Sequence, residues 1–402
     1  MNLTNNQKFS INHDPIKGRC LIANETIYTG EIIFEELPLV CSQFLWNAEC
    51  KYDACQFCLT PLETAEENVT RLTKEQIQLP YVEQCCQTNK SKHINCSGCG
   101  QNERYCSIEC CQLAYEHYHQ LLCPSRSKEL ENNLNKLCDL WKSIHYPPET
   151  ASIMLLVKIL ARIKQDPTFI EKLQQFSSNI IVEQTDKLVH ILCGDKFHEQ
   201  IEILRQIVSE IFSPNDEILQ PFLTENGFKS LLAIIGKNGQ GIGTSAFSQW
   251  AKNCEQFLAN NPEELDKINQ LTDSLFDKLD EISGCFLNNE GSGLYELQSC
   301  INHSCQPNSE VCFLKNNFIL SLKAIETINQ GEEITICYLD ECWQNRSRHS
   351  RNKYLQKNYL FICQCRKCQQ QINDPDVTSD EEEDSDLQSN PDDDDDDAMN
   401  CD

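Results

Sequence analysis

The spacing of apolar residues divides the chain into strand-like and helix-like stretches. Near the start, two short apolar-rich runs over 19–23 and 31–36 are typical of strands, and the Thr29-Gly30 pair between them is a turn signal. Further along, residues at the helical 3.6 period predict an amphipathic helix whose start Pro147-Pro148-Glu149 can provide. The apolar positions of this helix are Ile153, Leu156, Val157, Leu160 and Ile163.

The same period recurs over 197–212 and 262–282, so most of 124–285 is expected to be helical. Strand-like runs then return at 318–322 and 334–338, separated by a turn at Asn329-Gln330-Gly331. Strands at both ends with helices between them predict an α+β fold.

Charge is concentrated at the end of the chain. The net charge is −27, and residues 374–402 contain 15 acidic residues and no lysine or arginine, which leaves −12 for the remainder. Such a tail cannot bury a core, so we expect 373–402 to be disordered. A net-negative body is a poor match to nucleic acid and a better match to basic proteins. No apolar run is long enough to span a bilayer, and residues 1–20 lack an export signal.

The 26 cysteines include an ordered array. With no export signal, metal ligands are favoured over disulfides. Cysteines are also common core residues, and each one alone could be explained in that way. Taken together, three close pairs followed by a histidine and a cysteine offer eight ligands, enough for two tetrahedral zinc sites. The eight are Cys55, Cys58, Cys96, Cys99, Cys106, Cys110, His119 and Cys123.

These residues resemble a MYND zinc finger, which is cross-braced. The resemblance implies that one zinc takes Cys55, Cys58, Cys106 and Cys110, and the other takes Cys96, Cys99, His119 and Cys123. The chain departs from the pattern in three ways: the gap from Cys58 to Cys96 is long, the histidine falls one residue late, and Ala114-Tyr115 replaces an Asp-Trp pair. Rival ligands are Cys50, Cys85, Cys86, Cys111 and His117.

Three further strings occur in a fixed order. They are NHSCQPN at 302–308, GEEITICY at 331–338, and a segment at 359–368 in which Tyr359 and Phe361 precede three cysteines. The first string alone would suit a proline-containing turn. The order and spacing of all three strings would rarely arise by chance.

Together the strings resemble a SET-domain lysine methyltransferase with a cysteine-rich post-SET segment. Lys17-Gly18-Arg19 and the run 29–33 resemble the opening strands of that domain. A SET domain split by a MYND finger is the hallmark of the SET-and-MYND-domain family, and the resemblance covers about residues 8–370. It implies the following parts: SET N-terminal part 8–50, MYND-type finger 51–123, helical insertion 124–285, SET catalytic core 286–340, post-SET segment 341–372 and acidic tail 373–402.

The resemblance also assigns roles to residues. S-adenosylmethionine is the implied cofactor, and Tyr338 matches the active-site tyrosine. Cofactor contacts fall to Lys17, Gly18, Arg19, Asn302, His303, Tyr338 and Phe361, and Tyr359 would wall the lysine channel. Core packing is the rival interpretation for His303, Tyr359 and Phe361.

A third zinc is implied as well. Three post-SET thiols need a fourth ligand, and the family supplies it from the Asn-His-Ser-Cys loop. This gives a structural site at Cys305, Cys363, Cys365 and Cys368, and three zinc ions in all.

The glycine-rich stretch 239–243 invites a nucleotide-loop interpretation, but it lacks the preceding strand and the acidic partner of such a loop. By resemblance it is expected to be a loop of the helical insertion that faces the cofactor site.

Two classes of function remain open. The first is an active protein-lysine methyltransferase acting on histones or other basic proteins, including ribosomal ones, as a cytoplasmic and also nuclear monomer. The second is an inactive zinc-finger scaffold or transcriptional co-regulator that recruits partners. A nucleic-acid-binding zinc protein is disfavoured by the charge.

The acidic tail generates a first prediction. Deleting 374–402 should leave zinc content, cofactor affinity and turnover on a short peptide nearly unchanged. On a strongly basic protein substrate the deletion should change the apparent KM in a salt-dependent way, since charge steering is screened over about 8 Å at physiological salt. Steady-state kinetics at two salt concentrations check this. Loss of folding or of peptide activity would show that the tail is structural.

Overall fold

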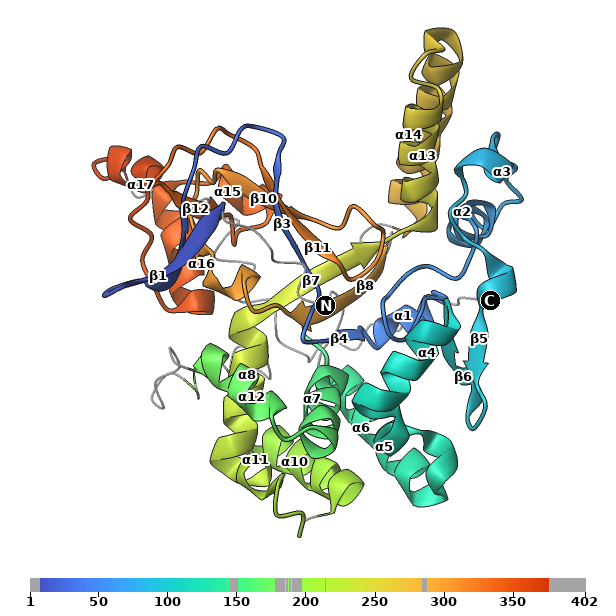
Figure 1. Cartoon of the computed structure of the whole chain (residues 1–402), viewed down its shortest axis with the longest axis vertical. Coiled ribbons are helices and arrows are strands. Elements are labelled where there is room, and N and C mark those ends of the chain that lie inside the picture. Colours follow the sequence, from blue (N-terminus) through green and yellow to red (C-terminus); the bar gives the residue numbers. More distant parts are fainter. Residues whose placement is uncertain are drawn as a thin grey trace. The chain divides into compact units, whose positions relative to one another are not determined.

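The computed structural model describes residues 8–144, 151–177, 185, 187, 189, 197–213, 215–283 and 288–375 (Figure 1). The expected helix start at 147–149 and most of the expected acidic tail lie outside these residues. The chain divides into two compact units. The first comprises Met1–Asn302 with Asn308–Thr335, and the second comprises His303–Pro307 with Ile336–Asp402.

One sheet of the first unit brings the start of the chain to its later part. Strands β1 (Phe9–Asp14), β2 (Gly18–Ala23) and β12 (Glu333–Ile336) are neighbours in that order, and β9 (Asn302–His303) belongs to the same sheet. The β2–β12 pairing is antiparallel, with Glu333 opposite Ile22 and Ile334 opposite Leu21. The strands predicted at 19–23 and 334–338 are therefore confirmed as neighbours in space, although β12 ends earlier than expected.

A second sheet has the order β10-β11-β3, and it confirms the strands predicted near 31–36 and 318–322. Its strands are β10 (Ser309–Cys312), β11 (Leu320–Ala324) and β3 (Ile32–Glu36). A third sheet has the order β4-β8-β7, formed by β4 (Val40–Gln43), β8 (Asn289–Leu294) and β7 (Gly239–Thr244).

The glycine-rich stretch is thus a strand, and the prediction of a loop was wrong. It pairs with β8 along its whole length, from Gly239 opposite Leu294 to Thr244 opposite Asn289. The physical reason is that exposed and buried residues alternate in this stretch. Ile242 and Thr244 are buried, and Gly243 between them is exposed. Period 2 over a short segment is the strand pattern, and the glycines mask it because they carry no side chains.

Helices fill the middle of the first unit. The predicted helix is confirmed as α7 (Ile153–Gln165), in which all five predicted apolar residues are completely buried. The two other predicted helices are confirmed as α10 (Phe197–Phe212) and α14 (Pro262–Ser283). The remaining helices of this middle stretch are α6 (Lys128–Ile144), α8 (Phe169–Ser177), α11 (Gln220–Leu223), α12 (Glu225–Asn238) and α13 (Ala246–Phe257).

The segment between Cys58 and Cys96 packs against helices that lie far along the chain. It contains α2 (Ala65–Thr73) and α3 (Val82–Cys85), which form one hydrophobic core with α13 and α14 (Figure 1). Asn68 fixes this contact, because its buried amide oxygen accepts hydrogen bonds from the Ser245 hydroxyl and from the backbone N–H of Phe247. The long gap is therefore filled by a helical element of its own.

The finger region and its flanks use short elements. They are α1 (Trp46–Glu49), η1 (Lys90–Lys92), β5 (Ile94–Cys96), β6 (Gly100–Tyr105), α4 (Ile108–Ala114), η2 (Tyr115–His119), α5 (Gln120–Leu122) and η3 (Pro124–Arg126). Later in the first unit, the 3₁₀ turn η4 (Gln298–Cys300) precedes Asn302.

The second unit is small and rich in cysteine. Its helices are α15 (Glu341–Gln344), α16 (Arg348–Tyr359) and α17 (Arg366–Gln370). Its core combines Leu339 and Leu355 with the three cysteines Cys305, Cys363 and Cys368. Among the described residues, no helix has both the length and the apolar character needed to cross a membrane.

The shared core of α2, α3, α13 and α14 generates a prediction. Trp250 on α13 is completely buried in this core and donates a hydrogen bond to the Pro80 carbonyl at 3.0 Å. Trp250→Ala should lower the free energy of unfolding by about 3–5 kcal/mol, because it removes a large buried side chain. Phe257→Ala, on the same helix at 54% exposure, is the matched control and should cost under about 1 kcal/mol. Equal effects in urea denaturation would show that this core does not support the fold.

Candidate functional site

The eight finger ligands gather into two groups in the first unit. Cys55, Cys58, Cys106 and Cys110 form one group, and Cys96, Cys99, His119 and Cys123 form the other. In each group the ligand atoms lie within 4.8 Å of one another. The Sγ atoms of Cys58 and Cys106 are 3.6 Å apart, and those of Cys96 and Cys123 are 3.9 Å apart.

These spacings suit zinc. A tetrahedral site with Zn–S bonds of about 2.3 Å has sulfur–sulfur edges of about 3.8 Å. Burial lowers the pKa of His119 to about 4, so the imidazole is neutral at pH 7 and its Nε2 can act as a ligand. That nitrogen lies 3.1 Å from Cys96 Sγ and 3.6 Å from Cys99 Sγ. The donor sets therefore fit two structural zinc ions.

A π-helical turn accounts for the late histidine. Residues Tyr115–His119 form η2, a π-helix that directly continues α4. A π turn holds one more residue than an α turn, so it absorbs the extra residue before His119 and keeps the imidazole facing the thiols. The departure from the finger pattern is thereby accommodated in the backbone.

The rival ligands lie elsewhere. Cys85 is buried in the core shared by α2, α3, α13 and α14, and the ring of His117 contacts Phe57 at 5.5 Å. Within the described part of the chain, none of the rivals Cys50, Cys85, Cys86, Cys111 and His117 belongs to a four-ligand group.

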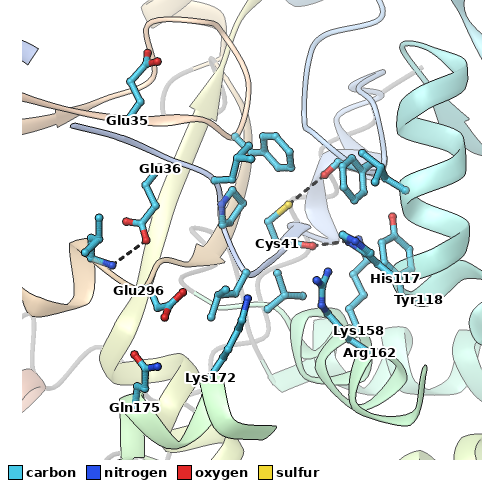
Figure 2. Close-up of a pocket in the computed structure, with 18 of the residues that line it drawn as sticks. Glu35, Glu36, Cys41, His117, Tyr118, Lys158, Arg162, Lys172, Gln175 and Glu296 are labelled. Atoms are coloured by element: carbon cyan, nitrogen blue, oxygen red, sulfur yellow. Dashed lines mark hydrogen bonds between the residues drawn. The ribbon is translucent and has the colours of Figure 1, made fainter. Parts of the chain in front are cut away.

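Lys158 joins the finger to the rest of the first unit. This α7 residue is buried, and its Nζ donates to the carbonyls of Cys41 and Gln56, both at 3.3 Å. It also lies 4.4 Å from the centre of the Tyr118 ring. Gln56 lies between the ligands Cys55 and Cys58, so the Lys158 ammonium connects α7 to β4 and to the first ligand group. Figure 2 shows the bond to Cys41. The sequence pattern marks Lys158 only as an interruption of an apolar run.

A third group lies in the second unit and unites Cys305 with Cys363, Cys365 and Cys368. Cys305 Sγ is 3.9 Å from that of Cys363 and 3.6 Å from that of Cys368. Hydrogen bonding within the group, led by Cys363, raises the pKa of Cys305 well above its usual range. Four thiols so close together need a cation before all can ionise. This donor set also fits a closed zinc site.

Aromatic rings surround Tyr338 in the same unit. Its ring centroid is 5.0 Å from that of Tyr359, 6.3 Å from that of Phe361 and 5.4 Å from that of His303. Burial raises the pKa of Tyr359, so its hydroxyl stays protonated. We call Tyr338, Tyr359, Phe361 and His303 the aromatic cluster.

His303 connects the aromatic cluster to the third metal group. Burial lowers its pKa to about 4, so the ring is neutral at pH 7. Its Nδ1 accepts the backbone N–H of Tyr338 at 3.0 Å, which places the ring proton on Nε2. Nε2 lies 3.2 Å from Cys305 Sγ and can donate to that sulfur. A metal at the third group would therefore also fix the backbone of Tyr338.

The residues expected to bind the cofactor from the first unit are held by a hydrogen-bond network. Gly18 has φ of 81°, a left-handed conformation that favours glycine. The Asn302 amide donates to the Arg19 carbonyl at 3.3 Å and to Glu333 Oε1 at 2.8 Å. Lys17 forms an ion pair with the same Glu333 carboxylate at 2.6 Å.

Glu333 was missed as a site residue, although it lies in the quoted 331–338 string. Its carboxylate connects Lys17 to Asn302, which are distant in sequence, and only the β2–β12 pairing brings these residues together. The sequence shows Glu333 only as an acidic residue within a motif. Such a residue does not indicate which side chains it will contact.

A cavity of about 510 Å³ in the first unit has Arg19 in its lining. Figure 2 shows other residues that line this cavity, among them Glu36 and Lys158. This volume suits a small-molecule ligand. Buried Arg19 Nε has no hydrogen-bond partner among the described residues, and Leu297 and Cys300, just before Asn302, line the same cavity. The cavity therefore offers an unsatisfied donor next to residues expected to bind the cofactor.

Comparisons with known proteins show the family of this chain. The SET domain model matches residues 18–339. Protein-lysine N-trimethyltransferase SMYD5 of Gallus gallus is 50% identical over 377 residues, covering 92% of this chain and 87% of the relative. The Homo sapiens protein of the same name is 47% identical over 369 residues, with 91% and 87% covered. Histone-lysine N-methyltransferase SMYD3 of Homo sapiens is 28% identical over 301 residues, with 74% and 54% covered.

The fold and the comparisons define a SET-domain protein. The chain belongs to the SET-and-MYND (SMYD) family of protein-lysine methyltransferases, and the sequence-based assignment to that family is confirmed.

The three donor groups generate a prediction about metal content. Metal analysis of the purified protein should give three zinc ions per chain, and Cys363→Ser should lose about one of them because it removes a ligand of the third group. Cys86→Ser, a half-buried thiol outside every group, is the control and should lose none. A wild-type content of zero or one zinc would contradict the three-site account.

Proposed function

We propose that this protein is an active protein-lysine N-trimethyltransferase that uses S-adenosylmethionine. The observation that carries the proposal is the aromatic cluster around Tyr338, which His303 ties to the Cys305 metal group. The extent of methylation rests on relatives of 47–50% identity whose names specify trimethylation.

The cofactor-binding residues are proposed from the family resemblance and are described for each unit by itself. From the first unit we propose Lys17, Gly18, Arg19 and Asn302, whose fit is supported by the partnerless Arg19 Nε beside a cavity of about 510 Å³. From the second unit we propose His303, Tyr338 and Phe361. S-adenosylmethionine supplies an activated methyl group on a sulfonium sulfur.

The protein has to orient and deprotonate the lysine amine. Tyr359 and Tyr338 would form apolar walls, and desolvation lowers the pKa of an entering ammonium so that its proton passes to solvent water as the side chain enters. The Tyr338 hydroxyl would then orient the lone pair of the neutral amine. Holding the amine in one geometry contributes to the rate through proximity.

Aromatic walls also suit successive methylations. A methylated ammonium is a cation that cannot donate as many hydrogen bonds, and it is attracted to the faces of aromatic rings. The rings of Tyr338 and Tyr359 lie 5.0 Å apart and offer such faces. The cluster would therefore hold the methylated ammonium that each transfer leaves, and this cation must lose its proton again before a further transfer.

Zinc would act structurally in this protein. We propose that the twelve ligands of the three groups form structural zinc sites. Each group has four protein donors, so no coordination position is left open. The third zinc would hold the segment 363–368 to the Asn-His-Ser-Cys loop, and so keep Phe361 and Tyr359 beside Tyr338.

The substrate is proposed to be a basic protein, such as a histone or a ribosomal protein. The chain outside the acidic tail has a net charge of −12, which attracts cationic partners. We propose that the protein acts as a monomer in the cytoplasm and also the nucleus, and that it binds neither nucleic acid nor membranes directly. We also propose the six parts expected from the sequence, from the SET N-terminal part at 8–50 to the acidic tail at 373–402.

The role of Tyr338 generates a prediction. Tyr338→Phe should still fold, bind cofactor and hold zinc, but its kcat should fall by about 10²-fold because one oriented hydroxyl is lost. Tyr354→Phe is the matched control: its ring packs on Trp343 at 4.7 Å, and its loss of a hydroxyl should leave kcat nearly unchanged. Methyl transfer from labelled cofactor to a basic protein measures both. Near-wild-type turnover of Tyr338→Phe would contradict the assignment of Tyr338 as the active-site tyrosine. Absence of methyl transfer by the wild-type protein would favour the inactive zinc-finger scaffold.

A further inference from the structure

A buried carboxylate at the end of β3 holds the turn that precedes Asn302. Glu36 is 8% exposed, and its two carboxylate oxygens accept the backbone N–H groups of Leu297 and Gln298 at 2.8 and 3.0 Å. Figure 2 shows the first of these bonds. Both amides lie at the start of η4.

The turn held by Glu36 carries residues of the proposed cofactor network. The Ser299 hydroxyl accepts a hydrogen bond from the Arg19 guanidinium at 3.2 Å, and the Asn302 amide donates to the Arg19 carbonyl. Cys300 and Ile301, between these two contacts, are almost completely buried. A shift of η4 would therefore move Ser299 and Asn302 together relative to Arg19.

We propose that Glu36 is a positioning residue for cofactor binding: its ionised form holds η4, and thereby Asn302, in the binding geometry, and its protonation loosens that turn. This inference rests on the proposed function. Glu36 lines the cavity beside Arg19, but its role is to act through η4 and not by touching the reacting atoms.

The acid–base chemistry of a carboxyl group explains the switch. An ionised carboxylate offers an acceptor to both amides, whereas a protonated carboxyl offers one acceptor oxygen and turns an O–H toward the other amide. Burial raises the pKa of Glu36 to about 7, and hydrogen bonds from the backbone N–H groups of Leu297, Gln298 and Glu296 oppose that rise. Glu36 is therefore mostly ionised at pH 8 and mostly protonated at pH 6.

Several other titratable groups lie around Glu36. Burial lowers the pKa of His117 to about 4 and raises those of Tyr295 and Cys300, so all three stay neutral between pH 6 and 8. The charged side chains lining the same cavity are Arg19, Glu35, Lys158, Arg162, Lys172 and Glu296. A substitution at Glu36 itself leaves any contribution from these groups common to wild type and variant.

Calorimetric titration of S-adenosylmethionine into wild type and Glu36→Gln at pH 6 and pH 8 tests the proposal. A glutamine has one acceptor oxygen and a donor amide, so it mimics the protonated glutamic acid at both pH values. Wild type should bind about tenfold more tightly than Glu36→Gln at pH 8, the value of one charge-assisted hydrogen bond. The ratio should fall to about twofold at pH 6, where about a tenth of Glu36 is ionised.

The ratio between the proteins is the readout because the cofactor's own amino group titrates near pH 8. Glu31→Gln is the matched control: Glu31 is the carboxylate just before β3, it pairs with Lys8 at 2.7 Å and does not line this cavity, and its variant should keep the wild-type pH dependence. Equal zinc content and melting temperature should show that the variants fold.

Hydrogen exchange of the cofactor-free wild type gives a test without a variant. After correction for the intrinsic pH dependence of exchange, the Leu297 and Gln298 amides should be better protected at pH 8 than at pH 6. A wild-type to Glu36→Gln affinity ratio that does not change with pH, or equal protection at both pH values, would overturn the role of Glu36 alone. Wild type that binds no cofactor at either pH would overturn the proposed function, and this inference with it.

Discussion

The second unit depends on bringing four thiols together in a group that could hold one metal ion. Cys305 and the cysteines of 363–368 are distant in sequence, and three of these four cysteines make up most of the fully buried core of this unit. The apolar core of this unit is too small to take the place of a metal-bound thiol group in stabilising the unit. Free energy of metal binding then becomes free energy of folding. The arrangement of Tyr338 follows, since His303 bonds to its backbone and lies beside Cys305 Sγ.

The finger in the first unit obeys the same constraint, and the surrounding helices adapt to it. The π turn at Tyr115–His119 corrects the position of one ligand, and Lys158 holds the first knuckle by its backbone. The inserted helices α2 and α3 find their core partners on α13 and α14 and leave the ligand pairs intact. Ligand geometry is therefore preserved despite a long insertion.

The sequence was sufficient for features that depend on residue type and short spacing. It predicted helix α7 and strands β2, β3, β11 and β12. The membership of the three donor groups that the structure brings together was implied by the family resemblance and not by spacing alone. The sequence failed where a partner lies far along the chain. The strand at Gly239–Thr244 needs β8 to satisfy its backbone, and Glu36 acquires its role only by meeting the amides of Leu297 and Gln298. Such contacts arise from tertiary packing and leave no local pattern.

The proposed lysine methyltransferase site depends on thiols organised by metal. Its most direct test is graded removal of zinc by a chelator, with released zinc, cofactor binding and methyl transfer followed in the same sample. The account predicts that transfer falls as zinc is released and returns when zinc is restored. Undiminished methyl transfer by the zinc-free protein would contradict it.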